Sequence, residues 1–130
     1  MNLNYKRLLV SLLIGTSMLV NYSCAFLAGG AAGIGALAFI GGELKSIEAV
    51  PLDRAWGAAQ KAIDEMGLKA ASKEKDDLSA RLVCNLANDK QLTINLKKKS
   101  SIVTEIGIRV GVFGNEFLSN QVLEKMRKEF

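Results

Sequence analysis

Alternation of apolar and polar residues is the feature that most constrains how this chain can fold. From residue 68 to residue 112, even-numbered positions are mainly apolar and odd-numbered positions are mostly polar. Successive side chains of a strand point to opposite faces of a sheet, so a period of two predicts antiparallel strands with one buried and one wet face. The apolar positions are Leu68, Ala70, Leu78, Ala80, Leu82, Cys84, Leu86, Leu92, Ile94, Leu96, Ile102, Ile106, Ile108, Val110 and Val112.

Segments rich in turn-forming residues divide this stretch into strands. Because every strand places its even positions inward, the numbers of directly opposed residues must have an even sum. Loops of three residues satisfy this condition, and they predict Leu86 opposite Leu92 and Leu96 opposite Thr104. The dividing segments are 75–77, 88–90 and 99–101.

Two further segments show the 3.6-residue period of amphipathic helices. The first opens at Pro51, whose missing N–H is harmless in a first turn, and ends at Gly67. The second runs from Glu116 to about Arg127, with Asn115 as its cap. The expected inward stripes are Leu52, Ala55, Trp56, Ala59, Ile63 and Met66 in the first helix, and Leu118, Val122 and Met126 in the second.

An additional strand is expected at 43–49, which gives the order β-α-β-β-β-β-α over residues 43–130. The predicted fold class is therefore α+β, a small two-layer domain with a mostly antiparallel sheet and two helices on one face. A hydrophobic leader and a Gly/Ala-rich segment precede this domain. Its 88 residues suffice for a core without metals or disulfides.

Composition and charge exclude several classes of function. The chain of 130 residues has no histidine, which rules out histidine triads and histidine metal sites. The formal net charge of +4 divides into +2 from residues 1–24 and +2 from residues 43–130, where 15 basic residues face 13 acidic ones. The densest basic run, 97–99, has no aromatic neighbour on which a base could stack, so no nucleic-acid partner is expected.

Residues 1–23 have the features of a signal peptide. Lys6 and Arg7 precede an uncharged apolar stretch of 13 residues, 8–20, which is too short to span a bilayer. Cys24 follows closely and resembles the lipidated cysteine of bacterial lipoproteins, with small Ser23 before it. We expect cleavage before Cys24 and acylation of its thiol.

Two other ways of processing remain open. Ser23 and Ala25 also satisfy the small-x-small rule for ordinary signal cleavage, which would release a soluble form. Residues 8–42 carry no charge over 35 positions, long enough for an uncleaved membrane anchor.

The segment 25–42 that follows the cysteine contains six of the chain's 12 glycines, with many alanines. As a helix it would measure about 27 Å, close to the thickness of a bilayer's hydrocarbon core. Ala25, Gly29 and Gly33 would then form a smooth helix-packing face. The segment is either such a membrane-inserting or self-associating helix, or an apolar tether behind the lipid.

Catalytic, cofactor-binding and metal-binding residues are not expected. Cys84 lies on the apolar side of its strand, where a thiol is usually inert, and there is no histidine to activate it. Asp76 and Asp77 are adjacent, so their side chains point apart and a turn is expected rather than a metal site. We therefore expect a protein that is not an enzyme.

A combination of short motifs along nearly the whole chain resembles a known family. The chain is similar to short bacterial lipoproteins grouped as domain of unknown function 3568. This resemblance implies an envelope location and no particular activity. The motifs are Cys24, the tract 25–42, Gly42-Glu43-Leu44, Pro51, Asp53-Arg54-Ala55-Trp56, Gly67-Leu68, Ser72-Lys73-Glu74-Lys75-Asp76 and Arg109-Val110-Gly111-Val112-Phe113-Gly114-Asn115-Glu116.

These observations predict a non-catalytic lipoprotein of the bacterial cell envelope, anchored through Cys24 on the periplasmic side of the outer membrane. Its folded domain would bind an envelope protein or another partner through the outer face or a free edge of the sheet. The alternative is a single-pass or self-associating membrane protein in which residues 25–42 drive insertion or oligomerisation.

Overall fold

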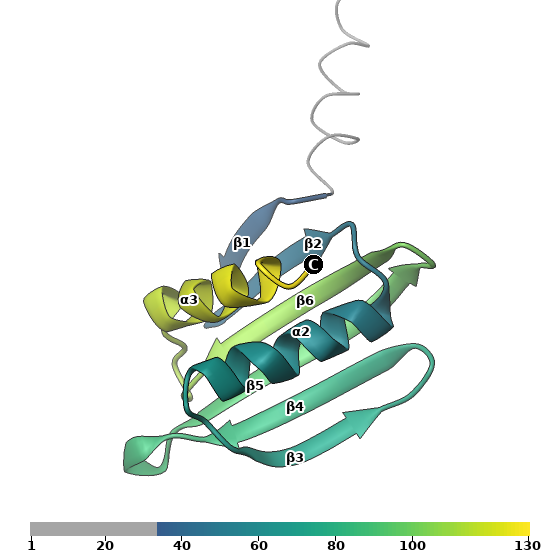
Figure 1. Ribbon diagram of the computed structural model, residues 1–130. Coiled ribbons are helices and arrows are strands. Elements are labelled where there is room, and N and C mark those ends of the chain that lie inside the picture. Colours follow the sequence, from purple (N-terminus) through teal and green to yellow (C-terminus); the bar gives the residue numbers. More distant parts are fainter. Residues whose placement is uncertain (1–33) are drawn as a thin grey trace, which may run out of the picture. The chain divides into compact units, whose positions relative to one another are not determined.

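The computed structural model describes residues 34–130, which form one antiparallel sheet and two helices. The strand order across the six-stranded sheet is β1-β2-β6-β5-β4-β3, and both helices cover the same face (Figure 1). The α+β fold class predicted from the sequence is confirmed. The elements are β1 (Leu37–Ile40), β2 (Glu43–Glu48), α2 (Leu52–Glu65), β3 (Ala70–Lys75), β4 (Ser79–Asn85), a 3₁₀ turn η1 (Ala87–Asp89), β5 (Gln91–Ser100), β6 (Val103–Val110) and α3 (Glu116–Arg127).

The two helices begin and end where the local sequence directs. Pro51 lies at the N-cap of α2, and Gly67 follows its end with a φ of +69°. Asn115 caps α3, because its side-chain oxygen accepts a hydrogen bond from the Leu118 N–H at 3.0 Å. The predicted bounds of α3 are confirmed.

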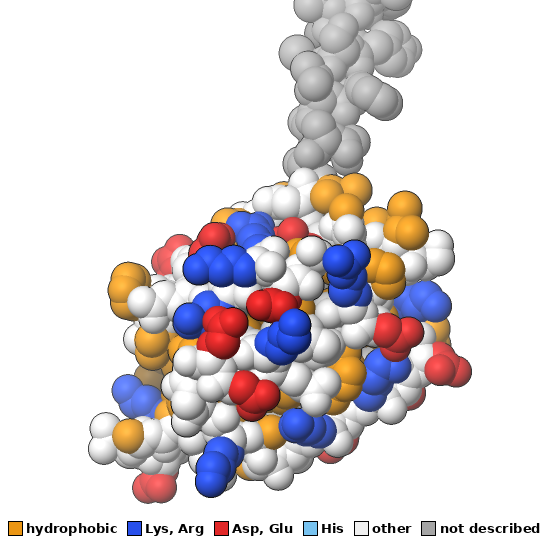
Figure 2. All heavy atoms as spheres, viewed as in Figure 1, with side chains coloured by type: hydrophobic (Ala, Val, Ile, Leu, Met, Phe, Trp, Pro, Cys, Tyr) orange, Lys and Arg blue, Asp and Glu red, His pale blue; other side chains and the backbone are white. Residues whose placement is uncertain are grey.

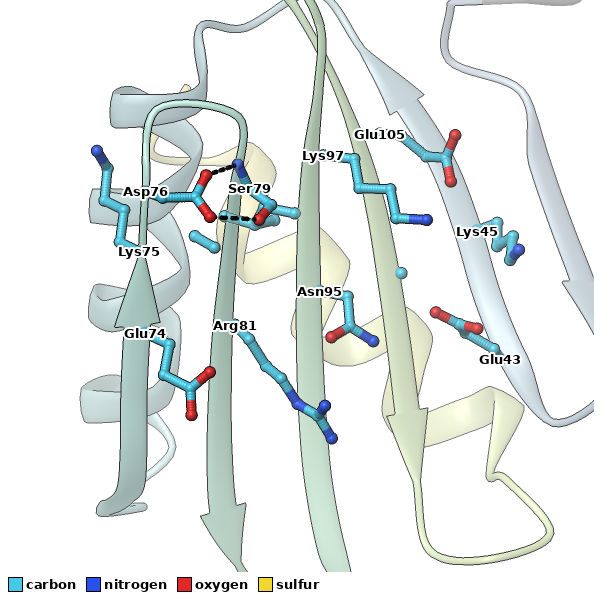
Figure 3. Close-up of a pocket in the computed structure, with 13 residues that line it drawn as sticks. Glu43, Lys45, Glu74, Lys75, Asp76, Ser79, Arg81, Asn95, Lys97 and Glu105 are labelled. Carbon is cyan, nitrogen blue, oxygen red and sulfur yellow. Dashed lines mark hydrogen bonds between the residues drawn. The ribbon is translucent and has the colours of Figure 1, made fainter.

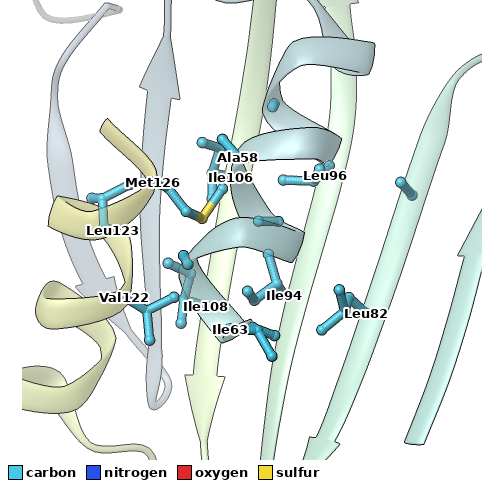
Figure 4. Close-up of a cluster of buried hydrophobic side chains, with 14 of the residues drawn as sticks. Ala58, Ile63, Leu82, Ile94, Leu96, Ile106, Ile108, Val122, Leu123 and Met126 are labelled. Carbon is cyan, nitrogen blue, oxygen red and sulfur yellow. The ribbon is translucent and has the colours of Figure 1, made fainter. Parts of the chain in front are cut away.

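The core lies between the helix layer and the inward face of the sheet (Figure 4). Ile63 of α2 and Met126 of α3 are fully buried against the sheet. At the end of β5, Lys98 and Ser100 are even-numbered but exposed. The predicted alternation is confirmed in the rest of the three central strands, whose apolar even positions are buried. Those positions are Ala80, Leu82, Cys84, Leu92, Ile94, Leu96, Ile106, Ile108 and Val110.

Strand pairing along β4, β5 and β6 obeys the parity rule outside the bulge at the end of β5, but the exact register differs from the prediction by two residues. Cys84 lies opposite Leu92, and Leu96 lies opposite Ile106. The first shift arises because Leu86 leaves the ladder and opens a wider loop, closed by a hydrogen bond from its N–H to the Lys90 carbonyl at 2.7 Å. The second arises because a bulge between Lys98 and Ser100 absorbs one residue before a tighter turn.

Three apolar residues assigned to the inward face are exposed instead. Leu78, Ile102 and Val112 are 69%, 65% and 83% exposed. Each lies in a connection beyond the end of a strand, where the alternation no longer corresponds to a sheet face. In β3, a bulge between Ala70 and Ser72 shifts the alternation by one residue. Odd-numbered Lys73 therefore pairs with inward-facing Leu82, on the helix side of the sheet.

The helix stripes also differ in detail. Trp56, Met66 and Leu118 are only partly buried, whereas Ala58, Ala62 and Leu123 are buried core residues that the predicted stripes lacked. Four alanines of α2 are buried in the core, whereas Trp56 and Met66 pack only partly against it.

The sheet has one strand more than the sequence predicted. β1 lies within the Gly/Ala-rich segment 25–42 and pairs with β2, with Phe39 opposite Leu44. The last part of that segment is therefore a strand and a turn, and a helix through residue 42 is wrong. Gly41 and Gly42 form the turn with positive φ angles of 59° and 82°.

Within residues 34–130, neither helix is long and apolar enough to cross a membrane. The predicted signal peptide 1–23, the lipidation residue Cys24, and the helix-packing residues Ala25, Gly29 and Gly33 lie outside the described residues.

Candidate functional site

The face of the sheet opposite the helices, called the open face below, carries polar side chains from several neighbouring strands. α2 and α3 pack only on the other side (Figure 1). Odd-numbered residues of β4, β5 and β6 and the register partners of these residues on β2 and β3 project from the open face.

A hollow of about 380 Å³ lies on this face, spanning β2, β6, β5, β4 and β3. We call it the sheet hollow. Figure 3 shows its polar side chains rising from neighbouring strands around a bare stretch of β6. The lining residues are Glu43, Lys45, Glu74, Lys75, Asp76, Ser79, Ala80, Arg81, Asn95, Leu96, Lys97, Glu105 and Gly107.

Gly107 creates the floor of the sheet hollow. It lies between buried Ile106 and Ile108, opposite Lys45 on one side and Asn95 on the other. A Cβ atom placed on Gly107 would overlap the carboxylate of Glu43, which occupies that space. Because glycine has no side chain, groups from the two flanking strands can extend over β6.

Five charged residues of the hollow make neither an ion pair nor a side-chain hydrogen bond with any residue from 34 to 130. They are the cations Lys45, Arg81 and Lys97 and the carboxylates Glu43 and Glu74. Figure 3 shows Lys97 of β5 and Glu43 of β2 extending over β6 from opposite sides, with Arg81 beside Asn95. Charges of both signs therefore line the hollow and stay available to a ligand.

The remaining acidic groups are engaged within the fold. Glu105 Oε2 lies 2.7 Å from Lys99 Nζ, and this hydrogen bond lowers the pKa of the Glu105 carboxyl. Asp76 Oδ1 accepts hydrogen bonds from the N–H groups of Leu78 and Ser79 at 2.7 and 2.8 Å. These bonds lower the pKa of Asp76, with the Leu78 bond as the largest cause. The turn predicted at Asp76-Asp77 is confirmed.

The arrangement is suited to recognition by charge. Ser79 Oγ donates to Asp76 Oδ2 at 3.2 Å, but this carboxylate is committed to two backbone N–H groups and is a weak base. Among residues 34–130 no group of three His, Cys, Asp or Glu residues could hold a metal ion. An ionic ligand would meet fixed cations, carboxylates and the Asn95 amide.

Cys84 lies on the other side of the sheet from the hollow. It is a free, fully buried thiol, paired across strands with Leu92 on one side and Ala70 on the other. Burial raises the pKa of this thiol. The prediction that Cys84 is a core residue is confirmed.

Sequence reasoning did not single out the sheet hollow. The outer face of the sheet was expected as one possible binding surface, but nothing marked Arg81 apart from other charges, and Lys97 stood out only as part of the basic run 97–99. One signal was present, because Gly107 stands between two isoleucines in the middle of a strand, and a glycine there indicates close approach by another group.

The comparison with protein families agrees with the resemblance seen in the sequence. The model of the family described as Protein of unknown function (DUF3568) matches residues 7–129. The chain belongs to this family. The DUF3568 match covers residues 34–129 of the described unit, so every strand lining the sheet hollow lies within the family domain. No curated protein matches the chain.

Proposed function

We propose that this chain is a non-catalytic lipoprotein of the bacterial cell envelope that binds a polypeptide segment carrying charges of both signs in the sheet hollow. The observation that carries the proposal is the set of charged side chains around Gly107 that have no ion-pair partner among residues 34–130. Lys45, Arg81 and Lys97 would pair with carboxylates of the partner, and Glu43 and Glu74 with its lysines or arginines.

The envelope location rests on the sequence of the first 24 residues. Lys6, Arg7, the apolar stretch 8–20 and Cys24 have the order of a lipoprotein signal. We propose acylation at Cys24 and attachment on the periplasmic side of the outer membrane. Membrane lipid and an envelope protein are then the two partners.

Absence of catalysis is part of the proposal. The chain contains no histidine, the thiol of Cys84 is buried on the far side of the sheet, and the hydroxyl of Ser79 is tied into a turn. These features support a binding role, because a nucleophile needs an accessible position and a competent base.

The binding proposal is tested by placing a photo-crosslinking amino acid at Asn95 in the full chain, expressed in bacteria. Arg54, an exposed residue on the helix side, carries the same probe as the matched control. We expect a discrete crosslinked protein from position 95 that is missing from position 54. Filling the hollow with Gly107→Val should reduce this crosslink at least several-fold.

Equal crosslinking from both positions, or a crosslink at 95 that Gly107→Val leaves unchanged, would contradict binding in the hollow. The Gly107→Val chain must retain its fold, which a melting curve establishes. Only the mobile end of Glu43 meets a Cβ at this position, so the substitution is expected to fold.

The alternative function assigns the activity to the Gly/Ala-rich segment as an insertion or oligomerisation element. Because β1 belongs to the folded sheet, a clean test deletes only residues 25–33 and keeps Cys24 and the strand. Under our proposal this deletion leaves the crosslink at Asn95 intact. Loss of envelope retention or of oligomers on deletion would favour the alternative.

A further inference from the structure

Exposed apolar side chains concentrate in two segments of the described chain. Seven of the nine large hydrophobic residues that are exposed lie in or beside β1 and in the connection from β6 into α3. We call them the apolar corner. They are Ile34, Leu37, Phe39, Ile40, Val112, Phe113 and Phe117, and Phe113 is 93% exposed.

The two segments are held together by backbone contact. A Cβ on Gly42 would strike the Phe113 carbonyl, and one on Gly114 would strike Gly42, so the β1–β2 turn packs directly on the loop before α3. Arg109 fastens both, donating from Nη2 to the Gly41 carbonyl at 2.9 Å and from Nη1 to the Val112 carbonyl at 3.4 Å. The corner is therefore one surface of defined geometry.

β1 itself lies outside the helix layer. The helices pack on β2, β4, β5 and β6, and all four residues of β1 are exposed. Leu37 and Phe39 share the helix side with their partners Ser46 and Leu44, whereas Ile40 projects from the open face. Figure 2 shows apolar side chains at the margin of the molecule where β1 and the start of α3 lie.

The opposite edge of the sheet has the protection that edge strands usually carry. β3 presents Lys73, Glu74 and Lys75 and contains a bulge, features that prevent pairing and keep an edge in water. Residues 34–42 contain no charged residue. An uncharged apolar edge and two exposed phenylalanines are typical of a surface that another apolar phase covers.

The sequence that precedes β1 points to membrane lipid as the apolar phase that covers the corner. The inference rests on the proposed lipid anchor at Cys24. Ile34 is the tenth residue after Cys24, so the acyl group holds the start of β1 within about 36 Å of the bilayer. The uncharged sequence runs without interruption from Cys24 to Gly42, so it introduces no charge that would keep β1 away from lipid.

We propose that the apolar corner rests on the lipid surface, with Ile40, Phe113 and Phe117 entering the boundary between headgroups and acyl chains. The sheet then stands on its β1 edge, with charged β3 away from the membrane. In this orientation the sheet hollow faces sideways along the membrane and stays open to a protein partner.

The test uses the full chain with its native anchor, purified from bacterial membranes and reconstituted into phosphatidylethanolamine–phosphatidylglycerol vesicles. A nitroxide is attached at Phe113→Cys or Ile40→Cys, and at Leu78→Cys as the matched control. Leu78 is also an exposed apolar residue, but it lies in the β3–β4 turn. The ratio of collisions with oxygen to collisions with a water-soluble nickel complex should be several-fold higher at 113 and 40 than at 78.

Equal nickel accessibility at all three positions would overturn the proposal. Spin–spin broadening at position 40, with shielding from both oxygen and nickel, would also overturn it by showing that a second copy covers the corner. Flotation of the chain with vesicles and the mass of its N-terminal peptide test the anchor separately. A floating, acylated chain with a water-exposed corner therefore refutes this inference and leaves the proposed function standing.

Discussion

Two glycines in contact, Gly42 and Gly114, determine how the β1–β2 turn meets the loop before α3. Both have positive φ, and the space for a Cβ on Gly114 is occupied by the Gly42 backbone. We expect Gly114→Ala to lower the free energy of unfolding by about 3 kcal/mol, from left-handed strain and the clash together.

Gly67 provides the matched control for this substitution. It also has positive φ, but nothing lies within 4 Å of a Cβ built there. Gly67→Ala should cost only about 1–2 kcal/mol, the penalty of the left-handed conformation. Urea unfolding of the purified chain in detergent measures the free energy of unfolding of both variants. If the two substitutions lower it equally, the contact with Gly42 contributes nothing.

Arg127 and Glu48 form the charged contact that fastens α3 to the sheet. Arg127 donates to Glu48 Oε1 from Nη2 at 2.7 Å and from Nε at 3.0 Å, and Ser46 also donates to this carboxylate. Glu48 is only 8% exposed. Arg127→Leu leaves that carboxylate without its cation and should destabilise the protein by about 2–4 kcal/mol.

The comparison for Arg127 is Lys125, which lies two residues earlier in α3 and pairs at the surface with Glu65 at 3.5 Å. Lys125→Leu should change the free energy of unfolding by less than about 0.5 kcal/mol. If the two substitutions have the same effect on urea unfolding, the Glu48–Arg127 contact does not hold α3 in place.

Interactions within a single helix contribute to the stability of α3 and α2. One substitution in each helix tests this contribution. Asn115→Ala removes the hydrogen bond to the Leu118 N–H and should destabilise by about 1 kcal/mol. Gly57→Ala, in the exposed middle of α2 with open space around it, should stabilise by about 0.5–1 kcal/mol. Thermal unfolding should show a lower melting temperature for Asn115→Ala and a higher one for Gly57→Ala. Shifts of the same sign would contradict this account.

Local signals explain why the helices and central strands could be predicted from the sequence. Asn115 and Gly67 mark helix ends by their own backbone chemistry, and strand parity follows from the burial of even positions. β1 has no such signal, because Leu37-Ala38-Phe39-Ile40 shows no alternation and becomes a strand only by pairing with β2.

The register and the sheet hollow could not be predicted for a related reason. Parity permits shifts of two residues, and the choice was made by the loop around Asn88 and Asp89, which both adopt positive φ. The hollow depends on which strands are neighbours. β2 and β6 are far apart in sequence, so Glu43 meets Gly107 only after the sheet has formed.

At the scale of the whole molecule, the resolved pKa shifts all point away from neutrality. The pKa values of Asp53, Asp76 and Glu105 are lowered by hydrogen bonds, so the stability these groups contribute is lost only as pH falls through their lowered values. Hydrogen bonds to Glu129 and Asp53 raise the pKa values of Lys61 and Lys75, so their contribution is lost only in strong base.

With no histidine in the chain, little titrates between these limits. The buried thiol of Cys84 has a raised pKa and stays protonated, so its effect also lies above neutral pH. We expect the melting midpoint to move by less than about 5 °C between pH 6 and 8. A larger shift in a calorimetric scan would reveal a coupled ionisable group within that range.

The anchor at Cys24 is the central claim, because it places the folded unit at a membrane and supports both the proposed partner and the orientation of the apolar corner. Intact-mass and N-terminal peptide mass spectrometry of the chain isolated from bacterial membranes tests it most directly. The account predicts an N-terminus at Cys24 with a thioether-linked diacylglycerol, and loss of this form in Cys24→Ala. An unmodified N-terminus after residue 24, or a chain that retains residues 1–23, would contradict it.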